Sequence, residues 1–165
     1  IQAEGQRKEQ RQPKMKAVVF LLVSLLAIAI VSCKQISYQE CRFTKELGEI
    51  VSIDIAPCEK EPCALKKGGN ETITITFIPH EVVTGAKIYA YAIFGLIPVR
   101  LPLPNPDACQ GYGLSCPLKS GVKVEFALVE FISPDFPSGN LKLKAQIKDQ
   151  NGKSLICGIV KLHIQ

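Results

Sequence analysis

The stretch Thr72-Ile73-Thr74-Ile75-Thr76-Phe77 decides the fold, because threonines alternate in it with large apolar side chains. Successive side chains of a β-strand point to opposite faces, so this alternation predicts a strand with one buried and one wet face. The same period recurs at 51–55, 122–126, 141–148 and 156–164, and residues 87–93 resemble a more central strand. Turn signals separate these segments at 67–70, 138–140 and 149–152. We therefore predict an all-β chain, an immunoglobulin-like β-sandwich of about seven strands.

The first 33 residues have a different character. Residues 1–14 are polar and lack an apolar period, so we interpret them as an upstream segment outside the domain. Met15-Lys16 then precedes an apolar run over 17–31 and small residues at Ser32 and Cys33. This order predicts a helical secretory signal peptide over 15–33, whereas a membrane anchor would need about 20 apolar residues. We assign residues 34–165 to one secreted β-sandwich domain.

The charge of the domain argues against a nucleic-acid partner. The whole chain has a formal net charge of +5, but residues 34–165 hold 15 Lys and Arg against 13 Asp and Glu, a net +2. No block of Lys and Arg suggests a polyanion-binding surface. We expect the domain to be a monomer.

Six cysteines of the domain indicate a disulfide framework, which is usual in secreted chains with an even number. They are Cys41, Cys58, Cys63, Cys109, Cys116 and Cys157. Sequence alone leaves their pairing open. The prolines around 58–63 and the glycines within 109–116 would let each segment close on itself, which leaves Cys41 and Cys157. A zinc site is the alternative, but the spacing within 109–116 is too wide for a usual ligand pair.

Little else in the sequence suggests chemistry. The two histidines, His80 and His163, accompany no nucleophile motif and no metal-ligand cluster, so we expect no enzyme, no metal and no cofactor. Asn70-Glu71-Thr72 is an N-glycosylation sequon in a glycine-rich turn, and we predict a glycan at Asn70.

Several motifs resemble the MD-2-related lipid-recognition (ML) domain family. They are Asp54-Ile-Ala-Pro-Cys58, Pro62-Cys-Ala-Leu-Lys-Lys-Gly68, the proline-rich run 98–109, Cys116-Pro-Leu118 and Ser154-Leu-Ile-Cys157. The run 98–109 is similar in particular to the Niemann–Pick type C2 sterol-transfer and group 2 mite allergen branch. The resemblance covers nearly all of residues 34–165. It implies the disulfides Cys41–Cys157, Cys58–Cys63 and Cys109–Cys116.

The resemblance also implies an apolar tunnel between the two sheets that holds a sterol or another small lipid. Carried over residue by residue, the lipid-binding positions are Ile55, Leu65, Leu101, Ile132, Phe136 and Pro137. Leu143 and Ala145 join them because they fall on the inward face of the predicted strand 141–148. Of these, Ile132, Phe136 and Pro137 match the mouth of the tunnel. Because nearly all are apolar, we expect selection by shape and desolvation rather than by charge. Plain core packing is the alternative for each of them.

Two departures from the sterol-transfer branch bear on the ligand. Ala145 stands where that branch has a tryptophan, and Leu101 stands where it has an aromatic residue. The tunnel could therefore be wider, which leaves fatty acids, other sterols and bulkier lipids open beside cholesterol.

We expect a secreted or endosome–lysosome lumenal carrier in intracellular sterol transport, which passes its lipid to a membrane or to a membrane-protein acceptor. One alternative is a secreted protein that recognises lipids in innate immunity or chemosensation. Another is an adhesion or receptor-binding module with a filled core and no tunnel.

Overall fold

The computed structural model describes residues 34–42 and 45–165. The predicted upstream segment 1–14 and signal peptide 15–33 lie outside the described residues. Within the described ranges the regular elements are all strands. No helix in this part of the chain has the length and hydropathy of a membrane span.

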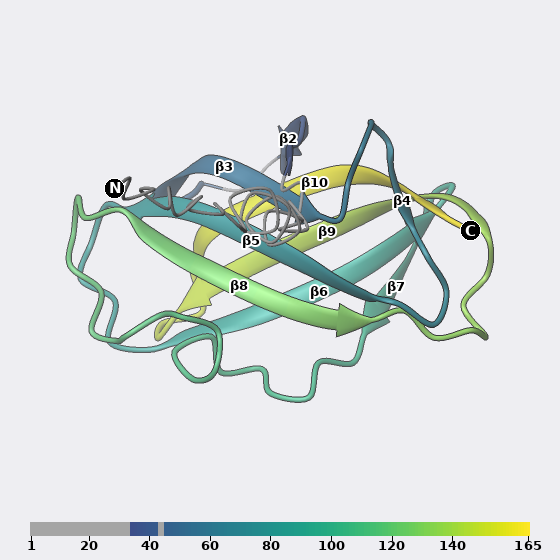
Figure 1. Cartoon of the computed structure of the whole chain (residues 1–165). Helices are drawn as coiled ribbons and strands as arrows, with labels where there is room; N and C mark the ends of the chain where they lie inside the picture. Colours follow the sequence, from purple (N-terminus) through teal and green to yellow (C-terminus); the bar gives the residue numbers. More distant parts are fainter. Residues whose placement is uncertain (1–33, 43–44) are drawn as a thin grey trace, which may run out of the picture. The chain divides into compact units, whose positions relative to one another are not determined.

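The strands form two antiparallel sheets packed face to face (Figure 1). One sheet has the order β1-β3-β5-β8, and the other has the order β2-β10-β9-β6-β7, with β4 added in parallel beside β10. The strands of the first sheet are β1 (Lys34–Gln35), β3 (Gly48–Ala56), β5 (Asn70–Pro79) and β8 (Val124–Phe131). Those of the second are β2 (Tyr38–Glu40), β4 (Cys63–Leu65), β6 (Ala86–Phe94), β7 (Ile97–Leu101), β9 (Gly139–Asp149) and β10 (Ser154–Ile164).

The predicted immunoglobulin-like sandwich is confirmed. Seven strands have five residues or more, and three short strands extend the sheets at their edges. On β5 the side chains of Ile73, Ile75 and Phe77 are buried while the threonines are half-exposed, as the alternation predicted. Phe77 and Phe126, from neighbouring strands, are among the largest fully buried side chains.

The three disulfides are those that the family resemblance implied. Cys41–Cys157 joins the start of the domain to β10 across a sequence separation of 116 residues. Cys58–Cys63 spans 5 residues between β3 and β4, and Cys109–Cys116 spans 7 in the connection between β7 and β8. The pairing is therefore confirmed.

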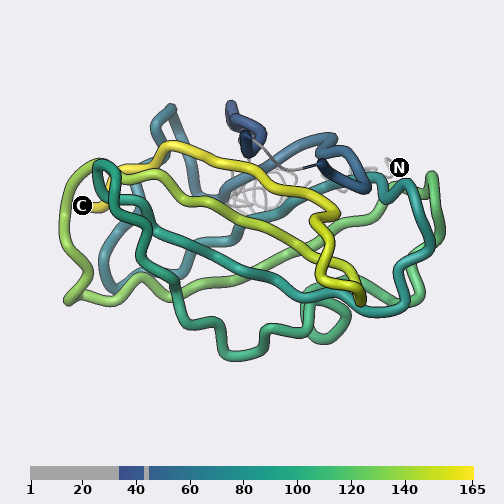
Figure 2. The backbone as a smooth tube through the Cα atoms, turned by 180° about the vertical axis from the view of Figure 1, so that it is seen from behind, coloured from purple at the N-terminus to yellow at the C-terminus, as the bar shows by residue number. Residues whose placement is uncertain are grey.

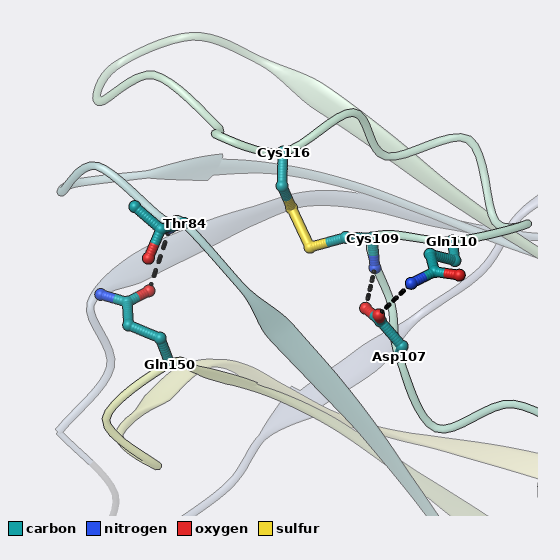
Figure 3. The surroundings of a disulfide bond; sticks show 6 residues. All are labelled: Thr84, Asp107, Cys109, Gln110, Cys116 and Gln150. Atoms are coloured by element: carbon teal, nitrogen blue, oxygen red, sulfur yellow. Dashed lines mark hydrogen bonds between the residues drawn. A yellow bond between two sulfur atoms is a disulfide. The ribbon is translucent and has the colours of Figure 1, made fainter.

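The long connection between β7 and β8, residues 102–123, runs along one side of the sandwich in both whole-chain views (Figure 1 and Figure 2). The Asp107 carboxylate helps to shape it, since it accepts hydrogen bonds from the Cys109 backbone N–H at 2.9 Å and from Gln110 Nε2 at 2.7 Å (Figure 3). Isolated bridges tie the same connection to Val83 and Lys87. Backbone hydrogen bonds from Ile88 N–H to the Pro106 carbonyl and from Ala108 N–H to the Ala86 carbonyl, both 2.9 Å, also anchor the connection to β6 of the second sheet.

Candidate functional site

An apolar cavity of about 220 Å³ lies between the two sheets. Side chains of β5 and β8 form one wall, and side chains of β6, β9 and β10 form the other. Residues of β4, the proline-rich segment 101–103 and the segment 131–136 complete the lining. Its bulk is aliphatic and aromatic, which is the usual character of a site for a hydrophobic ligand.

The cavity exists because one wall carries small side chains. Ala90 pairs with Ala145 across β6 and β9, and Ala92 pairs with Leu143 in the same register. All four of these residues line the cavity. Two packed sheets lie about 10 Å apart, and side chains from both inner faces normally fill that space. Three methyl groups on one wall leave part of it unfilled.

Six of the eight predicted lipid-binding residues line this cavity: Leu65, Leu101, Ile132, Phe136, Leu143 and Ala145. Ile55 and Pro137 are not among the lining residues. Ile55 is fully buried on β3, between β1 and β5, on the side of the first sheet away from β8. Pro137 is exposed, because the preceding residue, Phe136, is the one that packs inward.

The segment 131–136 is held at one rim of the cavity by backbone hydrogen bonds. Gly68 N–H donates to the Ile132 carbonyl at 2.7 Å, and Ile132 N–H donates to the Gly69 carbonyl at 2.9 Å. Further along, the Phe136 ring lies against the Phe94 ring of β6, with centroids 6.1 Å apart. The segment therefore bridges the two sheets, with the apolar side chains of Ile132 and Phe136 on the cavity.

Two carboxylates that were not among the predicted site residues also line the cavity. Glu71 and Glu130 are directly opposed residues of β5 and β8. Glu71 is only 2% exposed, and burial raises the pKa of its carboxyl group against the opposing effect of Lys66. Burial likewise raises the pKa of the half-buried Glu130. The expected set of nearly all apolar residues therefore leaves out two acidic groups of the lining.

A signal for both glutamates was present in the sequence. Glu71 has the phase of Ile73 and Ile75, so a strand that begins at residue 70 must turn it inward. Glu130 has the phase of Phe126 and Leu128 in the same way. Extending each alternation by one step would have placed both carboxylates on the inner face.

The other polar candidates lie elsewhere. His80 is exposed and approaches Glu49 at 4.0 Å, and the His163 ring lies 2.8 Å from the Asn140 side-chain oxygen. Arg100 is exposed and lies over the Tyr89 ring, 5.2 Å from its centroid. Among residues 34–42 and 45–165, no group of three His, Cys, Asp or Glu side chains could hold a metal ion. Asn70 is exposed at the first position of β5.

The fold and the cavity together define a class, a disulfide-bonded β-sandwich with an apolar cavity between its sheets. Within that class the chain belongs to the ML domain family, whose sequence model matches residues 35–164.

Known relatives agree with this assignment. The chain is 26% identical over 149 residues to the NPC intracellular cholesterol transporter 2 of Sus scrofa, with 90% of this chain and 97% of that protein covered. It is also 26% identical over 139 residues to the ecdysteroid-regulated 16 kDa protein of Manduca sexta, covering 84% and 95% of the two chains. The crystal structure of a Niemann–Pick type C2 protein from the Japanese carpenter ant has the same fold, with a TM-score of 0.73 at 22% identity, over 79% of this chain and 100% of that one.

Proposed function

We propose that this domain binds a sterol or another small lipid in the cavity between its sheets, carries it, and catalyses no reaction. The observation that carries the proposal is the apolar cavity, which six independently expected residues line. The curated relatives support it, since several are named as intracellular cholesterol transporters. The three disulfides fit an extracellular or lumenal location.

The size of the cavity bears on how a lipid would enter. Its volume of about 220 Å³ exceeds the roughly 150 Å³ that admits benzene in an engineered protein cavity. It falls short of the roughly 300–1,000 Å³ of a typical drug-sized site. A sterol or fatty acid therefore needs either an outward shift of side chains at the rim or a bound pose that leaves part of it outside. Ile132, Phe136 and Leu101 are the side chains placed to make that shift.

The expected affinity suits a carrier. At roughly 0.3 kcal/mol per heavy atom, a sterol-sized ligand gains about 8 kcal/mol, which corresponds to near-micromolar binding. A complex of this strength protects the lipid from water and still releases it. We propose a membrane, or a membrane protein with its own lipid site, as the acceptor.

The test combines identification of the natural ligand with titration. Lipids extracted from natively secreted protein are identified by mass spectrometry, and the purified protein is titrated with a fluorescent sterol and a fluorescent fatty acid. Ile132→Asp places a carboxylate on the cavity wall, where contact with a bound lipid would desolvate it at a cost of several kcal/mol. Val129→Asp is the matched control, because Val129 lies on β8, three residues before Ile132, but is 64% exposed and does not line the cavity.

We expect Ile132→Asp to abolish lipid binding and Val129→Asp to preserve it. If the wild type carries no lipid and binds neither probe, the proposal is wrong. If Ile132→Asp binds as well as the wild type, a lipid is carried at a different place.

A further inference from the structure

We infer that Glu71 and Glu130 are the head-group site of the cavity, and that they select lipids whose polar end is an uncharged hydrogen-bond donor, an alcohol, over lipids that end in a carboxylate. This inference rests on the proposed function and adds the chemical class of the ligand. It predicts that of two lipids with the same hydrocarbon skeleton, the alcohol binds and the acid is rejected.

The two carboxylates belong to one place. Glu71 and Glu130 are register partners on β5 and β8, and both line the cavity. Directly opposed residues of antiparallel strands project from the same face with Cβ atoms about 4.5–5.5 Å apart. The pair therefore forms a single acidic group on an otherwise apolar wall.

Glu71 has an acceptor that nothing in the described part of the chain satisfies. Its Oε1 accepts a hydrogen bond from the Lys66 backbone N–H at 3.3 Å, but its Oε2 is buried and has no partner. The residue as a whole is 2% exposed, so this oxygen is shielded from bulk water. A buried acceptor without a donor carries the full cost of its desolvation. A ligand hydroxyl in the cavity would supply the missing donor.

The surroundings of the pair disfavour an anionic ligand, because the lining offers no cation to compensate a further negative charge. The lining contributed by β6, β7, β9 and β10 holds no charged side chain. The cation that acts on Glu71 is Lys66, whose exposed side chain lies outside the lining. A carboxylate ligand would add a third negative group in a medium where charges are weakly screened. Burial already raises the pKa of both glutamates, in the direction expected where negative charge is costly.

Ser133 is the remaining polar residue of the lining, and it does not replace the pair. Its hydroxyl oxygen accepts a hydrogen bond from the Asp135 backbone N–H at 3.2 Å within the 131–136 segment. The head-group role therefore falls to the oxygen that lacks a donor, Glu71 Oε2.

The experiment uses two matched ligand sets at pH 7.5. One set is oleyl alcohol, oleyl methyl ether and oleic acid, and the other is cholesterol, its methyl ether and cholesteryl hemisuccinate. Each ligand competes with N-phenyl-1-naphthylamine for the wild type, Glu71→Gln and Glu71→Gln/Glu130→Gln. Glu125→Gln is the control, because Glu125 lies on β8 but is exposed on the outer face. Glutamine keeps the size of glutamate, and melting curves confirm that each variant folds.

For whichever skeleton the wild type binds, we expect the alcohol to bind about tenfold more tightly than the ether or the acid, the value of one hydrogen bond to a charged group. The preference over the acid should fall to within about threefold in the double variant and persist in Glu125→Gln. Equal binding of alcohol and acid by the wild type, or a preference that survives in the double variant, would overturn the inference. A wild type that binds neither set would instead overturn the proposed function.

Discussion

Filling the cavity with a side chain separates a ligand site from a packing defect. Ala145 contributes one of the small side chains that leave the space open, and Ala145→Phe would place a phenyl ring there. An apolar cavity of roughly 150 Å³ admits benzene, so the ring fits a space of about 220 Å³. If it fills about half of that volume, the gain at about 24 cal/mol per Å³ is near 2.5 kcal/mol. Strain from imperfect packing offsets about 1–3 kcal/mol of this.

The unfolding free energy should therefore change by less than about 2 kcal/mol, while lipid affinity falls about 100-fold or more because the ligand must displace the ring. Urea unfolding and sterol or fatty-acid titration measure the two quantities on the same sample. Lys144→Phe is the control, since Lys144 is the neighbouring residue of β9 and lies over the Tyr91 ring on the outer face. A variant that binds lipid as well as the wild type would refute the assignment of the cavity. A loss of stability well beyond 3 kcal/mol would show that the space is not open in solution.

Three further predictions concern stability and modification. Replacing both cysteines of Cys41–Cys157 by serine should destabilise the domain by about 3 kcal/mol more than the same change at Cys58–Cys63. The reason is that the first disulfide closes a loop of 116 residues and the second a loop of 5. Equal shifts of the urea midpoint in the two variants would contradict this prediction. The raised pKa of Glu71 means that the folded protein loses stability as pH rises from the ordinary value of 4.5 through the raised value. Glu71→Gln removes this pH-dependent loss of stability, so the urea midpoint of the variant should exceed that of the wild type at pH 8 but match it at pH 4. A difference between the two midpoints that does not depend on pH would count against the raised pKa of Glu71. Asn70 is exposed, so protein secreted from eukaryotic cells should lose mass on treatment with peptide-N-glycosidase, and Asn70→Gln protein should not.

Most of the fold could be predicted from the sequence because alternation reports one-sided burial directly. Residues 72–77 and 141–148 alternate cleanly, and both lie in long strands of the sandwich. β7 was harder to predict, because Ile97–Leu101 contains a proline and is largely exposed at the edge of its sheet. The C-terminal end of β8 was difficult to predict from alternation for a related reason, since Val129 and Phe131 are apolar yet 64% and 55% exposed. Only the pairing with β5 makes that end a strand.

The site was predictable only in part, since the family resemblance marks positions and tertiary structure decides which of them meet. Leu65 and Leu143 are far apart in the sequence and reach one cavity because β4 and β9 both flank β10. Ile55 is equally apolar and equally inward, but it lies on β3 and faces a different part of the core. The two glutamates form no polar motif along the chain, because they are far apart in the sequence. Glu71 and Glu130 meet only through the register of β5 and β8.

The space between the two sheets is densely packed in one region and open in another. This difference explains how one small domain can be stable and still hold a lipid. At Gly158 of β10, an added Cβ would lie 2.9 Å from Ile53 Cδ1 and 3.1 Å from Ile50 Cδ1, so β3 packs on β10 without spare room. The disulfide Cys41–Cys157 fixes the same region. In the other region, the alanines of β6 and β9 face β5 and β8, and their small side chains leave the cavity unfilled. Because contacts in the dense region do not depend on the cavity being filled, the domain can lose and regain a ligand without losing its fold.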